Sequence, residues 1–361
     1  MTLIEFGLIR KFLFFPFVHP FFCTTKRFFI LKVEKIAKEK GYLIYYSIIN
    51  IFSIHLSLLF LIIPEIISRN LQKRKNLDLI SDAYENSNLI LRTYSNINLK
   101  IFLLILLTTL FYYPGILILT EGYYLCIGRF FLLFCLGFWS FFILKIKIHR
   151  HQIFGIILIA FGTVFLIFMN NFNNNITLIN LILLIVGCFL FSMSLVIKKY
   201  LLEKFYVSPF FILLIEGIFG LLIDIIITFI LIQFNKFQIE EFKNFLNILS
   251  ENKLNYFYII INSIFEGITQ TLIIITNFYF TPTMIGISDY LSVFFEGILY
   301  HVYVDYYIGY FIIIIGCLIY NELIILKFCD FEIYTKKYII NRSTIDTKLL
   351  DRDDTDSEFD N

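Results

Sequence analysis

Long apolar segments alternate with short polar ones from about residue 42 to residue 327. Each apolar segment has about 20 residues, enough for an α-helix to cross roughly 30 Å of hydrocarbon. The pattern predicts nine membrane-spanning helices, at residues 42–66, 99–120, 122–144, 153–170, 176–197, 208–234, 256–278, 282–303 and 306–327. The polar stretches 67–98 and 235–255 are expected to be loops.

The two ends of the chain do not fit this pattern. Residues 1–41 contain an apolar stretch with basic residues and prolines around it. We expect a degraded tenth span, a re-entrant piece or an interfacial amphipathic segment there. Residues 328–361 form a tail that becomes acidic and poor in apolar residues, and it is expected to be disordered. The predicted fold is an all-α, polytopic membrane protein of nine to ten transmembrane helices.

Basic residues orient these helices, because cytosolic loops of membrane proteins are enriched in Lys and Arg. They gather in every second connection: 67–98, 145–151, 198–204 and the residues after 326. The third group includes Lys198 and Lys199, which are expected to lie in a loop. The C-terminus is therefore expected to be cytosolic. With nine spans the N-terminus would be lumenal, and its lysines between residues 32 and 40 contradict the rule. That conflict stays open.

Two pairs of glycines indicate an internal repeat. Gly155 and Gly162 lie seven residues apart, and Gly309 and Gly316 repeat this spacing 154 residues later. Small residues at such positions let helices pack closely. We therefore expect residues 42–170 and 176–327 to be two related transmembrane repeats, about five helices each and inverted with respect to one another. The site of such a fold lies between the halves, near the middle of the membrane.

Ionisable residues inside apolar spans cost about 2.5–3.5 kcal/mol each on insertion scales and usually face a polar pathway. The spans contain one arginine and five acids: Arg129, Glu216, Asp224, Glu266, Asp289 and Glu296. Together with the polar stripe of the span at 256–278, they give the candidate substrate or ion pathway: Arg129, Glu216, Asn262, Glu266, Gln270, Asp289 and Glu296. The alternatives are interhelical hydrogen bonds for the amides, a structural pair for Glu216 and a counter-ion role for Arg129.

The excess of acids over bases bears on the solute. It favours a cationic or zwitterionic solute, or carboxylates that carry protons coupled to transport, with Glu266 or Glu296 as the proton carrier. A nucleotide-sugar diphosphate is less favoured, because phosphate binding requires several Arg or Lys side chains.

Composition limits the other possibilities. Hydrophobic residues make up 59% of the chain, and a formal net charge of +2 gives no sign of a nucleic-acid partner. The six cysteines have no metal or redox spacing and are most simply small apolar packing residues. His19, His55 and His301 have no ligand-spaced partners. No catalytic residue, metal site or cofactor is therefore expected, and the protein is not expected to be an enzyme.

The segment from Arg129, RFFLLFCLGFWSFFILKIKIHRHQIFGIILIAFG, resembles the fourth and fifth spans of the drug/metabolite transporter superfamily, specifically the F branch of solute carrier family 35. Residues 207–220 and 309–325 look like the seventh and last spans, and the chloroquine-resistance-transporter-like family is a close second. The chain departs from the pattern at Lys198-Lys199, where a Glu-Glu pair is expected. The resemblance, over residues 99–327, implies the ten-helix fold and secondary transport by alternating access.

These observations favour a secondary transporter of a small polar organic solute in an endomembrane: lysosome, vacuole, endosome or Golgi. The expected partners are the solute, protons, the lipid bilayer and a second copy of the chain. Asp346-Thr347-Lys348-Leu349-Leu350 fits a sorting signal, which adds sorting adaptors. The alternatives are a nucleotide-sugar or other metabolite antiporter and, in another class, a non-transporting membrane scaffold or a membrane-integral enzyme.

Overall fold

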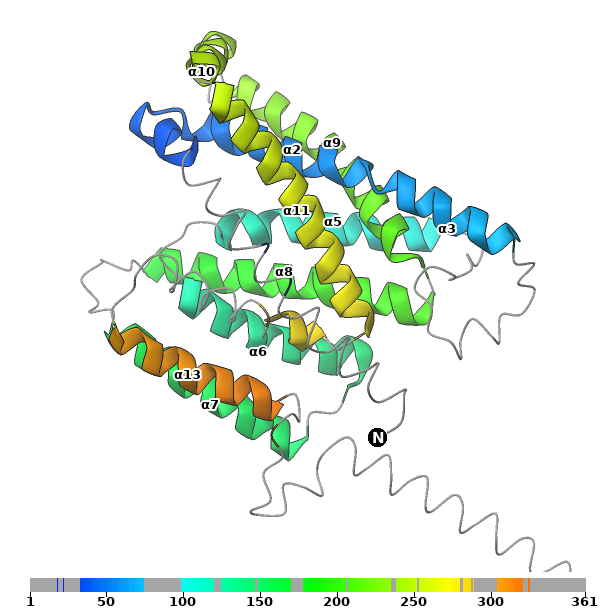
Figure 1. Ribbon diagram of the computed structural model, residues 1–361, viewed down its shortest axis with the longest axis vertical. Coiled ribbons are helices and arrows are strands. Elements are labelled where there is room, and N and C mark those ends of the chain that lie inside the picture. The colour runs from blue at the N-terminus through cyan, green and yellow to red at the C-terminus, as the bar shows by residue number, and fades with distance from the viewer. Residues whose placement is uncertain are drawn as a thin grey trace, which may run out of the picture. The chain divides into compact units, whose positions relative to one another are not determined.

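The computed structural model describes residues 18, 22, 33–74, 99–119, 125–146, 149–169, 178–205, 207–234, 238–251, 253–279, 282–286, 288, 304–320 and 324. The regular structure of these residues is helical, without a strand, which confirms the all-α class. The helices are α2 (Leu43–Leu59), α3 (Ile62–Arg74), α5 (Leu99–Leu119), α6 (Leu125–Leu144), α7 (Arg150–Met169), α8 (Leu178–Lys204), α9 (Pro209–Gln233), α10 (Ile239–Glu251), α11 (Lys253–Tyr279) and α13 (Val304–Tyr320) (Figure 1).

Several helices have the length and apolar character of membrane spans. Four of the described helical stretches are long and apolar enough to cross a bilayer: Ile44–Ile67, Ile182–Lys204, Pro209–Gln233 and Lys253–Phe278. The α9 helix shows why: large apolar side chains such as Leu222, Ile225 and Phe229 are exposed, which suits a lipid environment. The protein is therefore membrane-embedded. Most of the span expected at 282–303 lies outside the described residues.

The segment expected as a loop at residues 235–255 contains α10, which corrects that prediction. Its apolar residues Phe242, Phe245, Leu246 and Leu249 follow helical spacing, and Phe245 and Leu249 are fully buried. The polar character of the segment reflects the outer face of an amphipathic helix. The stretch expected as a loop from residue 67 likewise begins as helix, since α3 continues to Arg74.

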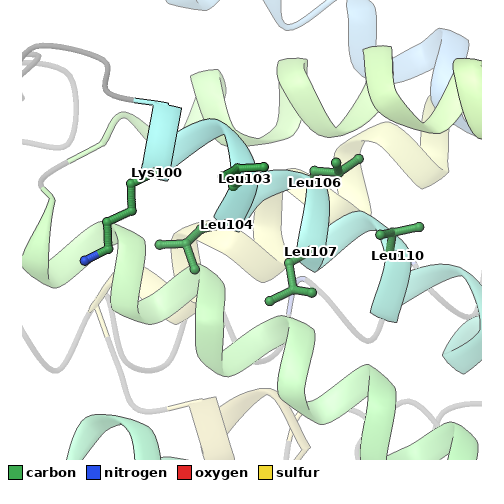
Figure 2. Close-up of a pocket in the computed structure, with 6 residues that line it drawn as sticks. All are labelled: Lys100, Leu103, Leu104, Leu106, Leu107 and Leu110. Carbon is green, nitrogen blue, oxygen red and sulfur yellow. The ribbon is translucent and has the colours of Figure 1, made fainter.

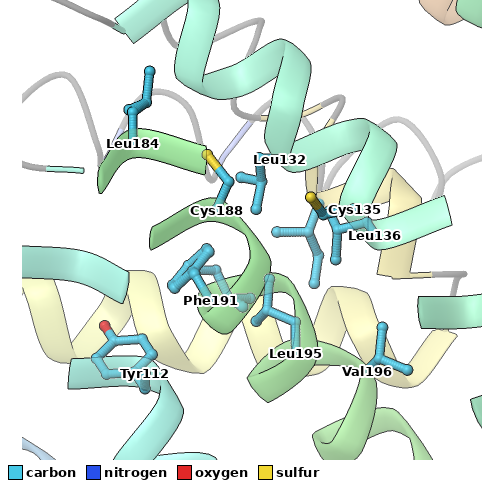
Figure 3. Packing of buried hydrophobic residues seen from close by; sticks show 11 residues of the cluster. Tyr112, Leu132, Cys135, Leu136, Leu184, Cys188, Phe191, Leu195 and Val196 are labelled. Carbon is cyan, nitrogen blue, oxygen red and sulfur yellow. The ribbon is translucent and has the colours of Figure 1, made fainter. Parts of the chain in front are cut away.

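Close packing divides the chain into two units. Unit 1 comprises Met1–Leu144 and Ile176–Tyr300, and unit 2 comprises Lys145–Asn175 and His301–Asn361. In unit 1, α8 packs against both α5 and α6. Figure 3 shows part of this core, where Leu132 and Cys135 of α6 meet Leu184 and Cys188 of α8. These two cysteines and Cys317 are buried and form no disulfide among the described residues, in agreement with an apolar packing role.

A short helical segment at residues 33–39 packs at one end of unit 1. Its Val33 and Ala37 join Tyr45 and Tyr46 of α2 and the buried residues of α10 in one apolar cluster. Tyr45 Oη also donates a hydrogen bond of 2.6 Å to Glu241 Oε2 of α10. The N-terminal segment and α10 therefore cover the same end of α2, as expected if residues 33–41 and 235–255 share one side of the membrane.

In unit 2, α7 and α13 form an antiparallel pair through the four repeated glycines (Figure 1). A Cβ on Gly155 would lie 2.9 Å from the carbonyl oxygen of Gly316, and one on Gly162 would lie 2.9 Å from that of Gly309. Both separations are too short for real Cβ contacts, so the missing side chains allow the two backbones to touch. The glycine spacing read from the sequence thus corresponds to a direct helix–helix contact.

Candidate functional site

A buried ion pair joins α8 to α9 in unit 1. Lys198 Nζ lies 2.8 Å from Glu216 Oε2, and their side chains are 1% and 3% exposed. Beyond this charge contact, neither carboxylate oxygen of Glu216 has a hydrogen-bond partner among the described residues. The two groups are thus held by charge, while the carboxylate keeps its capacity to accept hydrogen bonds.

An aromatic ring links this ion pair to helices α5 and α11. Lys198 Nζ lies 4.8 Å from the centroid of the Tyr112 ring, within range of a cation–π interaction. The hydroxyl of Tyr112 accepts a short hydrogen bond from Gln270 Nε2. The same amide donates a 2.7 Å hydrogen bond to Glu266 Oε1, one turn earlier on α11. We call Glu216, Lys198, Tyr112, Gln270 and Glu266 the central polar network.

The central polar network lies well inside the helices that form it. Lys198, its member closest to a helix end, precedes the last residue of α8 by six positions. At 1.5 Å per residue this is about 9 Å along the helix axis. Figure 3 shows Tyr112 at the edge of a cluster of apolar side chains from α6 and α8, beside Phe191. The network is therefore a buried polar region that borders the apolar core between α6 and α8.

A second set of polar contacts joins the α2–α3 region to α9. His55 Nδ1 lies 2.9 Å from Asp224 Oδ2, and both side chains are buried. Ser208 Oγ, at the start of α9, donates a 2.7 Å hydrogen bond to Glu65 Oε2 of α3. Since later residues of α2–α3 meet earlier residues of α9, the helices run antiparallel.

The polar stripe predicted on α11 is buried along its length, from Asn262 to Asn277. Asn262 Nδ2 donates to Asn50 Oδ1 of α2 at 2.7 Å, and Asn277 Nδ2 donates to the Leu195 carbonyl of α8 at 2.7 Å. For these two amides the structure has the interhelical hydrogen bonds that were the alternative to a pathway role. The Oδ1 atom of each is buried without a hydrogen-bond partner in the described part of the chain.

The structure brings together three of the seven predicted pathway residues: Glu216, Glu266 and Gln270. Asn262 lies one turn before Glu266 on α11, outside the network. Arg129 belongs to α6, but its side chain lies outside the described residues. Asp289 and Glu296 also lie outside them.

Lys198 and Lys199 are the main correction to the sequence analysis. They were expected in a basic cytosolic loop, but both belong to α8 and are buried. Lys199 Nζ donates to the Phe278 carbonyl at 2.9 Å and lies 3.2 Å from Glu203 Oε1. The sequence analysis therefore missed two buried bases that lie close to acids. The signal available was the apolar run Tyr200-Leu201-Leu202 that follows them, through which the helix continues to Lys204.

His55 and Glu65 were also missed as site candidates. His55 has no partner near it in the sequence, because Asp224 lies 169 residues away. Glu65 was read as the end of a span, yet it is buried against Ser208. Only tertiary contact reveals either pair.

A separate groove beside α5 has a mainly apolar lining. It has a volume of about 380 Å³ and is lined by Lys100, Leu103, Leu104, Leu106, Leu107 and Leu110 (Figure 2). Apart from Lys100, these are leucine side chains of a single helix. The groove suits an acyl chain better than a polar solute.

Neither a metal-binding cluster nor a known relative indicates a function for the site. In the part of the chain that the structure describes, no group of three or more His, Cys, Asp or Glu is placed to hold a metal ion. No protein family model matches the sequence, and no curated protein matches it significantly. The inference of function therefore rests on the residues of the chain itself.

Proposed function

We propose that the protein is a secondary transporter that carries a small polar organic solute across an endomembrane by alternating access. The observation that supports this is the central polar network, which links two carboxylates and an ammonium across four apolar helices. A buried ion pair contributes little net stability compared with apolar side chains of similar volume. Charges inside membrane helices usually serve a substrate or ion pathway. The network is therefore our candidate for the solute site.

The chemistry of the network favours a zwitterionic solute. Glu216 is placed to receive an ammonium, because both its oxygens keep free acceptor capacity. Lys198 is placed to receive a carboxylate, and its ion pair with Glu216 would open to admit both ends of a zwitterion. The additional buried lysines make a purely cationic solute less suitable than the sequence had indicated. Arg129, Asn262, Asp289 and Glu296 remain proposed contributors to the pathway.

The proposal includes membership of the drug/metabolite transporter superfamily and two inverted five-helix repeats. Two helix pairs support the repeats. The α2 and α9 helices contain the second spans of the expected halves, and α7 and α13 contain the fifth. Each pair packs antiparallel within its own unit, as equivalent helices of inverted repeats do when they meet.

A phosphate-containing solute is the second candidate, as in a nucleotide-sugar or metabolite antiporter. Lys198 and Lys199 provide two buried cations that the sequence analysis had placed in a loop. Each already has an acid within 3.2 Å, however, in Glu216 and Glu203. Phosphate would have to compete with these carboxylates, so we rank this solute class below a zwitterion.

Transport should depend on Glu266. In liposomes containing the purified full-length protein, we expect uptake of a zwitterionic solute from a panel of amino acids, amines and nucleotide sugars. Glu266→Gln removes the charge beside Gln270 and should lower that uptake about tenfold or more, the equivalent of one charge-assisted hydrogen bond of about 1.5–3 kcal/mol. The matched control is Glu240→Gln, an exposed acid of α10, which should transport normally.

Two outcomes would contradict the proposal. Equal uptake by Glu266→Gln and the control would remove Glu266 from the pathway. Liposomes that take up no member of the panel would favour the scaffold alternative, in which the polar network only fastens the helices. Preferential uptake of nucleotide sugars would select the antiporter.

We also propose that the protein resides in an endomembrane with its C-terminus in the cytosol. Single cysteines introduced at 145, 204 and in the tail after residue 327 should react with a membrane-impermeant thiol reagent from the cytosolic side. A cysteine at 173 should react only after the membrane is opened. If position 145 and the tail are labelled from opposite sides of the membrane, the expected number of spans between them is wrong.

A further inference from the structure

His55 and Asp224 meet where α2 packs against α9, away from the central polar network. Their side chains are 2% and 7% exposed, and Nδ1 of the ring lies 2.9 Å from Oδ2 of the carboxylate. The pair therefore lies inside the helix interface. Neither residue is part of the pathway proposed from the sequence.

Glycines of α9 hold the histidine in place. A Cβ on Gly220 would lie only 2.1 Å from Cδ2 of His55, so the ring lies directly on the α9 backbone. A Cβ on Gly217 would lie 2.9 Å from Cβ of Leu58 and 3.1 Å from the His55 carbonyl oxygen. The two helices are thus in contact at the ring and one turn away from it, at Leu58. While that contact lasts, bulk water is kept from the pair.

The charge of this pair depends on one proton. With the imidazole protonated, the pair holds one positive and one negative charge and is neutral overall. When the imidazole is neutral, the carboxylate leaves a net negative charge inside the interface, where it is poorly solvated. Separation of the helices would admit water and relieve that cost. Helix contact and proton binding therefore favour one another.

Other titratable groups on the neighbouring elements have partners of their own. On α9, Glu216 pairs with Lys198, two turns before Asp224. On α11, Glu266 accepts from Gln270, and the adjacent Gly267 lies against Ser57 of α2. Glu65 of α3 accepts from Ser208, and Glu241 of α10 accepts from Tyr45 near the start of α2. His55 and Asp224 are therefore the ionisable pair that lies between α2 and α9.

We propose that His55 and Asp224 form the proton-binding site of the transporter, which closes the α2–α9 contact when occupied and releases it when the proton leaves. The inference rests on the proposed function, because alternating access is what makes opening of this contact useful. The α2 helix belongs to the first expected repeat and α9 to the second, so the contact lies between the halves that move. The coupling ion is thereby assigned to this pair and not to Glu266.

The first test needs no solute. We measure the thermal unfolding midpoint of the purified protein in detergent at about pH 5 and pH 8. The protonated pair contributes stability at low pH, and the contribution is lost as pH rises. The midpoint should therefore fall by several degrees more in the wild type than in His55→Gln, which keeps a hydrogen bond but binds no proton. His149→Gln, a histidine outside unit 1, is the matched control and should behave as the wild type.

Equal pH dependence in the wild type and His55→Gln overturns the proton-binding site. If His55→Gln does not fold, Asp224→Asn replaces it, because this change removes the negative charge and leaves the imidazole in place. The same loss of pH dependence is expected from it.

The second test separates coupling from a static ion pair. In liposomes, His55→Gln and Asp224→Asn should exchange internal for external solute at equal pH, yet lose accumulation driven by a pH gradient. Gradient-driven accumulation that survives in both variants overturns the coupling role. If the wild type transports no solute, the proposed function and the coupling role fail together. The stability measurement still decides whether the pair binds a proton.

Discussion

Replacing Lys198 by methionine is expected to lower the free energy of unfolding by about 3–5 kcal/mol. The substitution leaves the Glu216 carboxylate buried without its counter-ion, because that side chain is 3% exposed and has no hydrogen-bond partner in the described residues. Glu216→Leu should lower the free energy of unfolding by a similar amount, because it leaves the Lys198 ammonium buried without its counter-ion. Urea or thermal unfolding of the purified protein in detergent measures both effects. Lys100→Met, an exposed lysine of α5, serves as the control.

The double variant Lys198→Met/Glu216→Leu distinguishes a structural pair from a solute site. Apolar residues of similar volume can replace a buried ion pair with little loss of stability, so most of the loss seen in the single variants should be recovered. Solute uptake should remain abolished, since neither charge is left to bind a zwitterion. A double variant as unstable as the sum of the singles would mean that the groups do not interact. Normal uptake by a stable double variant would show that the ion pair has only a structural role between α8 and α9.

The second large effect is expected from Gly155→Ala in α7. Its new Cβ would lie 2.7 Å from the backbone nitrogen of Tyr320 and 2.9 Å from the Gly316 carbonyl oxygen. Backbone atoms cannot change rotamer as side chains do, so α7 and α13 have to move apart. We expect this to lower the free energy of unfolding by about 1–3 kcal/mol. Gly155→Leu should separate the helices completely. Thermal unfolding and a disulfide cross-link between α7 and α13 both report the loss.

Gly309→Ala is the matched substitution on the partner helix. Its nearest neighbours, at 2.6 Å, are side-chain atoms of Leu166, which can change rotamer. We therefore expect a smaller loss than for Gly155→Ala. Equal losses at the two glycines, or none at Gly155, would show that the close backbone approach does not hold the pair together.

Hydropathy predicted most of the helices because the length of an apolar run is a local property of the chain. The α11 helix and its buried stripe from Asn262 to Gln270 follow directly from apolar length and helical periodicity. The α10 helix was missed because its polar outer face was read as a loop, although Phe245 and Leu249 already showed the spacing of an amphipathic helix.

The site was less predictable because its contacts are not local. Glu216 and Glu266 were identified from the cost of a charge inside a membrane, and Gln270 from the polar stripe of its span. The structure joins all three in one network. Tyr112 carried no signal, since the chain has 23 tyrosines. Lys198 was misplaced because a lysine near the end of an apolar run is normally assigned to the adjoining loop. Its acid partner lies on the next helix, and no local pattern reveals it.

The cluster at one end of α2 has a consequence for how the chain is made. Tyr45 leaves the ribosome 196 residues before its hydrogen-bond partner Glu241. At about 5–20 residues per second, this delay is about 10–40 s. Throughout it, the apolar faces of residues 33–39 and of α2 lack the surface that α10 later supplies. This segment is thus synthesised well before its packing is completed, and lipids or insertion factors must cover it until then.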